Sequence, residues 1–247
     1  MIPKNVYEVV RRLTKSSLNS IGFDLIRTSK LAEFNLCGLR KIPIKTIIDI
    51  GANTGQFARS MRAHFPEANF LCFEPLPEPY TMLQNWVNET PDRVQSFNVA
   101  IGNQDGETQM FFHRDFSPSS SLLANTAIGE KIFPVTKNQE RVTIKLSTLD
   151  HALQNIKLED KILIKLDVQG YEDRVLEGGE VTFGKAAACI LEISLDDLYV
   201  GQADFRGLYN RLDQMNYRYA GNLSQVYAED GHVIYLDSVF VRRDTKV

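Results

Sequence analysis

Two glycines and an acidic residue lie close together in the segment IIDIGANTGQF. Gly51 and Gly55 follow an apolar run, and Asp49 stands two residues before the first glycine. Glycines in a turn between a strand and a helix let the backbone approach a ligand and donate N–H groups to it. A pyrophosphate favours G-x-G-x-x-G, whereas the spacing here is G-x-x-x-G. The glycines could also do no more than shape the turn, with Asn53 or Thr54 capping the following helix.

The charge of Asp49 separates two kinds of ligand. A carboxylate here would repel a pyrophosphate, but it suits a ligand with an ammonium group beside a carboxylate, such as the methionine end of S-adenosylmethionine. Glu74 ends the next apolar run, where a carboxylate can accept hydrogen bonds from both hydroxyls of a ribose. We therefore predict an S-adenosylmethionine site. The predicted contacts from these two segments are Asp49, Gly51, Ala52, Asn53, Gly55 and Glu74.

Two further apolar runs end in polar or small residues. Asn98 and Ala100 close the third run, where an adenine ring would lie, although Asn98 is also an ordinary turn residue. Asp167 ends the fourth run, and Gln169 and Glu172 follow it. We predict that Asp167 and Gln169 contact the cofactor, and that Asp167 or Glu172 removes a proton from an acceptor hydroxyl. The acidic pair could instead hold a divalent cation, or Glu172 could only charge the first turn of its helix.

Three other groups of residues are weaker candidates. Residues 119–121 form a run of serines in a polar loop that could contact the ligands or be solvated. Residues 111–114 could line an acceptor pocket or form an exposed strand end. Glu192 ends the fifth apolar run on the same side and could touch the acceptor. The histidines lack metal-ligand spacing, so no residue is assigned to a metal.

These residues need a sheet that brings the ends of separate runs together. From Thr46 onward, short apolar runs alternate with helical stretches, which is typical of a doubly wound α/β sheet. The predicted strands are 46–50, 69–74, 94–99, 162–167 and 188–193, and the predicted helices are 56–65, 79–89, 171–178 and 205–215. An extra strand pair, 108–112 and 142–146, precedes the fourth core strand. Segments 217–220, 225–228 and 233–242 predict an antiparallel element with a turn at 229–231.

The first forty residues have helical spacing and predict an N-terminal helical extension, 1–40, followed by a single domain, 41–247. This extension could be a lid, a homodimer contact or a cap on the sheet. A net charge of -3 over 247 residues disfavours nucleic acid as a partner. The three cysteines are widely spaced, which argues against a disulfide framework and a zinc site. No apolar run reaches the roughly 20 residues of a membrane helix, and we expect a cytoplasmic enzyme without a membrane partner.

The order of the motifs resembles that of the FkbM-type methyltransferases, a branch of the class I S-adenosylmethionine-dependent enzymes. DIGANTGQF, FEP, NVAIGN, a serine pair and KLDVQGYEDRVLEGG carry the resemblance over residues 46–195. It implies a Rossmann-like, mostly parallel, seven-stranded sheet and methyl transfer to an oxygen of a sugar, polyketide or other small secondary metabolite. It matches Asp49, Gly51, Asn53 and Gly55 to the cofactor loop, Glu74 to the ribose acid, and Asp167, Gln169, Gly170 and Glu172 to the family signature.

Two other functions stay open at this point. An oxidoreductase that binds NAD(P) or a nucleotide sugar could use a similar sheet, although the missing middle glycine and Asp49 speak against it. A non-catalytic module that binds S-adenosylmethionine could dock a partner through its N-terminal helices. The first alternative predicts binding of NAD, and the second predicts cofactor affinity without turnover.

Overall fold

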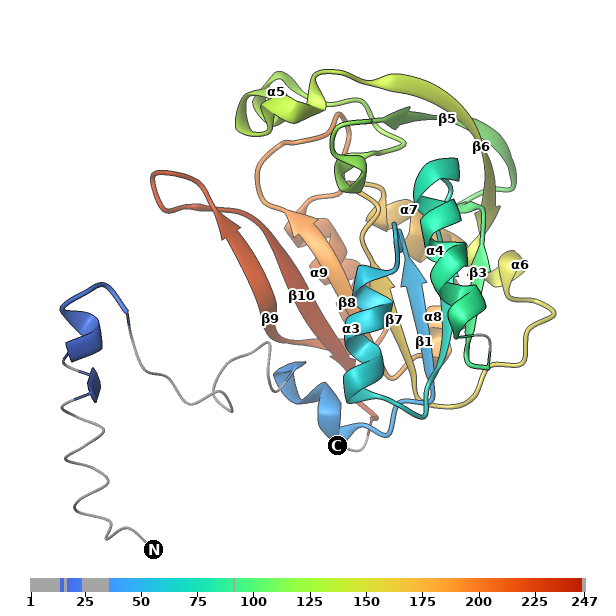
Figure 1. Cartoon of the computed structure of the whole chain (residues 1–247). Helices are drawn as coiled ribbons and strands as arrows, with labels where there is room; N and C mark the ends of the chain where they lie inside the picture. Colours follow the sequence, from blue (N-terminus) through green and yellow to red (C-terminus); the bar gives the residue numbers. More distant parts are fainter. Residues whose placement is uncertain (1–13, 16, 24–35, 91, 246–247) are drawn as a thin grey trace, which may run out of the picture.

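The centre of the molecule is a seven-stranded sheet, in a computed structural model that describes residues 14–15, 17–23, 36–90 and 92–245. In spatial order its strands are β3 (Val94–Phe97), β2 (Asn69–Phe73), β1 (Thr46–Ile50), β7 (Ile162–Leu166), β8 (Ala188–Ser194), β10 (Val233–Arg242) and β9 (Tyr217–Tyr227). The first five strands are parallel, and β10 is antiparallel to both of its neighbours. The predicted mostly parallel, seven-stranded sheet is therefore confirmed (Figure 1).

The two central strands are buried along their whole length. Every residue of β1 and of β7 is buried, as expected for parallel strands that are covered on both faces. One polar residue interrupts each apolar run, and these two residues, Asp49 and Lys165, are register partners across the two strands. A buried acid thus lies beside a buried base near the carboxyl ends of the strands.

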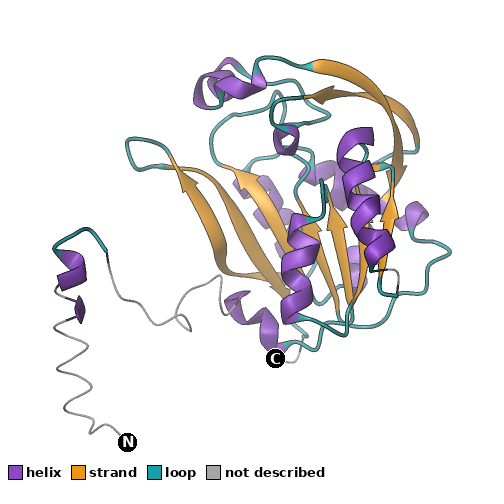
Figure 2. Ribbon diagram, in the orientation of Figure 1, coloured by secondary structure: helices purple, strands orange, loops and turns teal. Residues whose placement is uncertain are grey.

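Helices cover both faces of the sheet, which makes the fold doubly wound (Figures 1 and 2). On one face lie α3 (Gln56–His64) and α4 (Pro77–Glu89), and on the other lie α7 (Glu172–Gly178), α8 (Glu180–Lys185) and α9 (Phe205–Gln214). Each face of the sheet has its own core, to which the helices of that face contribute apolar residues. Leu83 and Trp86 of α4 belong to one core, and Leu208 and Leu212 of α9 belong to the other. The four predicted helices are confirmed, and α8 was not predicted.

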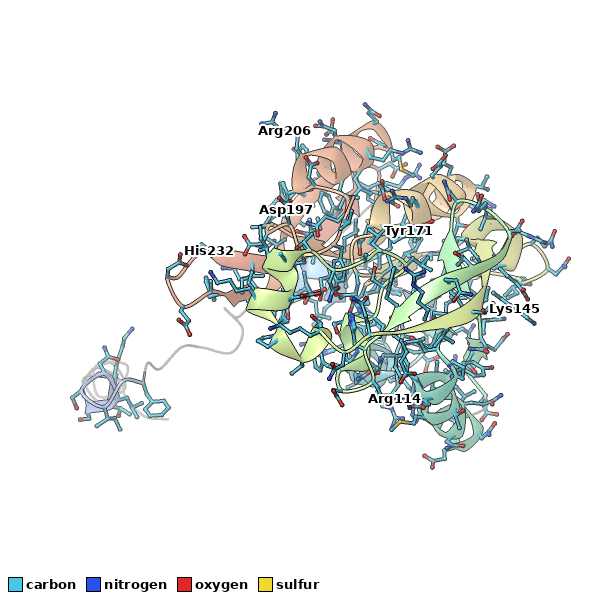
Figure 3. The ribbon with its side chains drawn as sticks, turned by 90° about the horizontal axis from the view of Figure 1, so that it is seen from above. Arg114, Lys145, Tyr171, Asp197, Arg206 and His232 are labelled. Carbon is cyan, nitrogen blue, oxygen red and sulfur yellow. The ribbon has the colours of Figure 1, made fainter. Side chains whose placement is uncertain are left out.

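A smaller, three-stranded sheet lies above the carboxyl ends of the central strands. It consists of β4 (Ala100–Gly102), β6 (Glu140–Thr148) and β5 (Gly106–Phe112). The predicted extra pair corresponds to β5 and β6, which are antiparallel, while the three residues of β4 are too few to show a pattern in the sequence. Seen from above, β5 and β6 cross the top of the molecule, with Lys145 at one edge and His232 at the opposite edge (Figure 3).

Short helical segments complete the upper loops and the lower edge of the domain. They are η2 (Leu36–Lys41), η3 (Ser117–Ser119), α5 (Ala127–Ile132), η4 (Pro134–Thr136) and α6 (Leu149–Ala152). The η2 segment buries Leu36 and Leu39 in the core on the α3 side of the sheet, so it spans the division expected at residue 40. Most of the predicted N-terminal extension lies outside the described residues.

The C-terminal hairpin differs from the prediction in its first strand. One continuous strand, β9, replaces the two predicted segments 217–220 and 225–228. Gly221 has a φ of +136° near irregularities in the β9–β10 register, and this explains why the sequence looked interrupted here. The predicted turn at 229–231 joins β9 to β10. Within the described ranges, no helix has the length and apolar character needed to cross a membrane.

Candidate active site

The candidate site lies where β1 and β7 run side by side and the order of the sheet reverses. β1 leads outward to β2 and β3, whereas β7 leads in the opposite direction to β8. Open α/β sheets bind ligands in the crevice at such a switch point, beyond the carboxyl ends of the strands. Gly51 follows β1 and Asp167 follows β7, so the two loops predicted from the sequence meet here.

Gly51 is in closer contact with the opposite loop than any other residue type would allow. Its φ is +80°, and a Cβ atom would lie 1.9 Å from the main-chain oxygen of Asp167. The N–H groups of Gly51 and Ala52 both donate to the carbonyl of Phe73, at 3.0 and 2.9 Å. The turn after β1 is therefore fixed against both neighbouring strands.

The rest of the glycine turn leads into α3 and contacts the serine loop. Gly55, with a φ of +87°, is the N-cap residue of α3, and no side chain caps this helix. The alternative in which Asn53 or Thr54 caps α3 is therefore wrong. Instead, the Asn53 side-chain Nδ2 donates to Oγ of Ser117 at 3.0 Å, which ties the glycine turn to the serine loop above it.

Glu74 lies directly after β2, with its carboxyl group turned toward the glycine turn. One carboxylate oxygen accepts from Asn53 N at 2.9 Å, and the other accepts from Leu76 N at 2.8 Å. The residue is only 4% exposed, and burial raises its pKa to about 7 although both N–H donors act in the opposite direction. Each oxygen keeps a lone pair that can accept from a ligand hydroxyl.

A first cavity opens between the glycine turn, the end of β2 and the small sheet. Its polar lining includes Asn53 and Glu74, and its apolar lining comes from Phe73, Val99, Ala100, Ile101, Met110 and Leu122, among others. An apolar cavity wall beside a carboxylate suits an aromatic ring attached to a ribose. The predicted Ala100 lies in this lining.

Asn98 supports the segment that follows β2. Its side-chain amide donates to the carbonyls of Glu74 and Pro75, each at 2.9 Å, and the residue does not line the first cavity. It holds the chain that carries Glu74. Its predicted contact with the cofactor stays a prediction.

The serine-rich loop covers the first cavity. Ser117, Pro118 and Ser120 line it, while Ser119 and Ser121 turn their hydroxyls to the carbonyls of Phe116 and Gln169. Ser120 is thus the member of the predicted run that reaches a cavity. Ser117 and Pro118 were missed, because only the run 119–121 was singled out.

Asp167 belongs to the wall of both cavities of the site. Its Oδ2 accepts from Lys165 Nζ at 2.6 Å, and its Oδ1 accepts from Gln169 Nε2 at 2.7 Å. The side chain is 25% exposed, so a ligand can reach it. Asp167 lines the first cavity together with Glu74, and it lines a second cavity together with Lys165.

The second cavity extends from Asp167 over the α3 face of β8 and β10. Its lining includes Gln56, Phe57, Lys165, Glu192, Leu223 and Asp237. Glu192 and Asp237 are direct cross-strand partners, and burial raises the pKa of both carboxyl groups. The weaker candidate Glu192 therefore lies where the sequence suggested. Lys165 and Asp237 were missed, because both lie inside predicted strands and only residues at strand ends were considered.

The match of the chain to a known protein family agrees with this geometry. A family model described as the methyltransferase FkbM domain matches residues 49–219, which is more than half of the chain. The chain belongs to the FkbM methyltransferase family. It is an S-adenosylmethionine-dependent methyltransferase, and this assignment excludes the oxidoreductase alternative.

Among the relatives, the 2-O-methyltransferase NoeI of Sinorhizobium fredii is 29% identical over 189 residues, which cover 72% of this chain and 74% of NoeI. The 31-O-demethyl-FK506 methyltransferase FkbM of Streptomyces tacrolimicus is 26% identical over 164 residues, covering 58% of this chain and 62% of that protein. A crystal structure of the FkbM methyltransferase of Methylobacillus flagellatus gives a TM-score of 0.49 at 14% identity, covering 81% of this chain and 44% of that one.

Glu172 of this FkbM-family methyltransferase lines neither cavity. It is 2% exposed, and its Oε1 accepts from the backbone N–H groups of Val168 and Gly170, each at 3.2 Å. Burial raises its pKa to about 7. Because its carboxyl group orders the loop that carries Asp167, the geometry favours a supporting role over catalysis.

Asp49 is buried behind the site rather than in its lining. It is fully buried, and neither carboxylate oxygen has a hydrogen-bond partner among the described residues. Burial raises its pKa to about 6, while the charge of Lys165 acts to lower it. Asp49 lines neither cavity, so its predicted contact with the ammonium group stays a prediction.

Two residues of the segment 111–114 are held by protein contacts. His113 is fully buried, and its Nδ1 lies 3.0 Å from the carbonyl of Ser119. Arg114 forms exposed ion pairs with Glu78 and Glu140. Only the strand-end interpretation fits Arg114. Within the described ranges, no group of three or more histidine, cysteine or acidic residues could hold a metal ion.

Proposed function

We propose that the protein transfers a methyl group from S-adenosylmethionine to a hydroxyl oxygen of a small acceptor, such as a sugar or another small secondary metabolite. The observation that carries this proposal is the position of Asp167, whose carboxyl group belongs to the wall of both cavities. A group at this boundary can act on an acceptor in one cavity while the methyl donor occupies the other. The relatives named as a 2-O-methyltransferase and a 31-O-demethyl-FK506 methyltransferase support oxygen as the methylated atom.

The first cavity fits the adenosyl part of the cofactor. Glu74 would accept from the ribose hydroxyls, and the apolar wall around Ala100 would contact the adenine ring. Gly51 and Asn53 line both cavities and would lie beside the methionine part, with Gly55 closing the turn. When bound, S-adenosylmethionine supplies an electrophilic methyl group.

Asp167 is suited to receive the proton of the acceptor hydroxyl. Lys165 and Gln169 hold its two oxygens from opposite ends, so the carboxyl group is oriented before a substrate arrives. The serine loop over the first cavity would keep water from the reacting atoms. A second version of this mechanism has Asp167 help to hold a divalent cation that activates the hydroxyl. Chelator treatment separates the two versions, because only the second predicts a loss of activity that added magnesium restores.

The test is replacement of Asp167 by Asn, which keeps the shape of the side chain and removes its basic oxygen. We expect kcat to fall by about a hundredfold or more, while the dissociation constant of S-adenosylhomocysteine changes little. The assay uses radiolabelled S-adenosylmethionine and a panel of methyl glycosides as acceptors. Asp92→Asn, at an exposed position remote from the cavities, is the matched control. Unchanged turnover in Asp167→Asn would reject the role and favour a non-catalytic module.

Three further properties belong to this proposal. We infer a cytoplasmic enzyme that acts on small molecules and not on nucleic acid, and the net charge of -3 supports the second point. We also infer a helical extension over residues 1–40, a methyltransferase domain over 41–247, and a homodimer contact made by the extension. Its helical spacing supports this inference, and the molecular mass in solution with and without residues 1–35 tests the contact.

A further inference from the structure

The side chain of Gln169 joins two carboxyl groups of the site. Its Nε2 donates to Oδ1 of Asp167 at 2.7 Å and to Oε1 of Glu192 at 2.5 Å. Both carboxyl groups line the second cavity, whereas Gln169 itself does not. The amide therefore stands behind the two acids and uses both of its N–H bonds on them.

The backbone of Gln169 is fixed in an unusual conformation. Its φ is +57°, a left-handed value that costs a non-glycine residue free energy and persists only where the surroundings enforce it. Its carbonyl accepts from Oγ of Ser121 at 2.7 Å. Gly170 follows with a φ of +93° and packs against Gln202. This conformation directs the Gln169 side chain back toward the strand ends.

Tyr199 contacts the carbonyl end of the Gln169 amide. This residue is 5% exposed, and its hydroxyl lies 2.5 Å from Oε1 of Gln169 and 2.9 Å from the carbonyl of Ser119. The carboxyl oxygens of Asp167 and Glu192 require the NH2 group on their side, so Oε1 faces Tyr199, whose single hydroxyl proton lies between this oxygen and the carbonyl of Ser119. With the amide reversed, Oε1 would face two carboxyl oxygens and the NH2 group would meet the hydroxyl. The hydrogen bonds thus run from Tyr199 through Gln169 to the two acids.

We propose that Gln169, held at its carbonyl oxygen by Tyr199, is a positioning residue for methyl transfer, and that it fixes Asp167 and Glu192 at the wall of the second cavity, where Glu192 contacts the acceptor. This inference rests on the proposed function, because it assigns the acceptor to the second cavity. It departs from the prediction that Gln169 contacts the cofactor. It also gives the buried hydroxyl of Tyr199 a part in the reaction.

Glu192 has the freedom that an acceptor contact needs. Its Oε1 is bonded to Gln169, whereas its Oε2 has no hydrogen bond from the described residues. Asp237, opposite it on β10, is likewise held at one oxygen by Ser224. The second cavity therefore offers free carboxyl oxygens to an acceptor that carries hydroxyl groups beside the one that is methylated. Glu192→Gln is expected to raise the KM of the acceptor about tenfold and to change kcat less.

A double-mutant cycle on Tyr199→Phe and Gln169→Leu tests whether Tyr199 affects methyl transfer through Gln169. In this cycle kcat is expressed per S-adenosylhomocysteine-binding site. Tyr199→Phe alone is expected to lower kcat about tenfold, and Gln169→Leu to lower it at least as much. In the Gln169→Leu background, Tyr199→Phe should change kcat less than twofold. Tyr217→Phe is the matched control, because its buried hydroxyl donates to Phe183 far from the site. It should lower the melting temperature and leave kcat unchanged.

A second readout does not depend on the acceptor. In protein labelled with 15N-glutamine, the side-chain NH2 signal of Gln169, assigned from its loss in Gln169→Leu, should be protected from solvent exchange. Tyr199→Phe should remove this protection, and Tyr217→Phe should keep it. If no glycoside is methylated, the proposed acceptor class fails while this signal still tests the contacts. An unprotected amide in the wild type, or independent effects of the two substitutions on kcat, would overturn the inference.

Discussion

Replacement of Gly51 by Ala tests the contact between the two loops that form the site. A Cβ atom at this position would lie 1.9 Å from the main-chain oxygen of Asp167, and the φ of +80° is unfavourable for alanine. The left-handed conformation costs about 1 kcal/mol, and forcing extra volume into a packed contact typically costs a further 1–3 kcal/mol. A total of about 2–4 kcal/mol corresponds to a melting temperature lowered by roughly 4–16 °C in a domain of this size.

A matched glycine separates the two contributions. Gly231 has a φ of +91°, and a Cβ atom there would meet no other atom within 4 Å. Gly231→Ala therefore carries only the conformational cost and should lower the melting temperature by roughly 2–4 °C. Gly51→Ala should also weaken binding of S-adenosylhomocysteine at least tenfold, because the loop that lines both cavities must move. Differential scanning calorimetry and calorimetric titration measure both effects. Equal melting temperatures for the two variants, with unchanged affinity in Gly51→Ala, would refute the inferred close approach.

Two further predictions concern the buried carboxyl groups. Burial raises the pKa of Glu74 to about 7, and its ionised form is the better acceptor for ribose hydroxyls, so the affinity for S-adenosylhomocysteine should fall as the pH drops from 8 to 6. Glu74→Gln should bind S-adenosylhomocysteine more weakly and with little dependence on pH in this range. A wild-type affinity that does not change with pH would contradict this prediction. The pKa of Glu172 is also raised to about 7, so its contribution to stability is greatest below its unfolded value near 4.5 and is lost as the pH rises through 7. Glu172→Gln should therefore gain stability relative to the wild type between pH 5 and pH 8 in urea unfolding, and a constant difference would show that Glu172 does not titrate in this range.

The parallel strands could be predicted almost to the residue. The runs that became β1 and β7 are apolar on both faces because helices cover the sheet on both sides, and each is followed by a glycine or polar turn. The short β4 could not be predicted, since its pairing with β6 depends on a strand forty residues away. In β9, the glycine at position 221 resembled a break, whereas the register shifts opposite β10 absorb it within one strand.

Parts of the site could be predicted because they follow directly from strand ends. Gly51, Glu74 and Asp167 lie where the order of the motifs placed them, and all three line the first cavity. The direction of a side chain is harder to predict, because it depends on what packs around it. Glu172 turns inward to satisfy two backbone N–H groups of its own loop, and Asp49 points to the α3 side of the sheet beside Lys165.

The contacts of Tyr199 could not be found in the sequence. This residue lies in the loop after β8, some thirty positions beyond Gln169, and no motif surrounds it. Its neighbourhood is created by tertiary structure alone, where the serine loop and the loop after β7 meet. Lys165 was hidden for a similar reason, since a lysine inside an apolar strand is explained only by its partner Asp167.

The switch point between β1 and β7 is the proposed binding site of S-adenosylmethionine and of its demethylated product. Titration calorimetry of the purified chain with S-adenosylhomocysteine, and separately with NAD, tests it without knowledge of the acceptor. We predict one saturable site per chain for S-adenosylhomocysteine, with affinity weakened by Glu74→Gln, and no heat of binding with NAD. Absence of heat with S-adenosylhomocysteine, or binding that Glu74→Gln and Gly51→Ala leave intact, would contradict it.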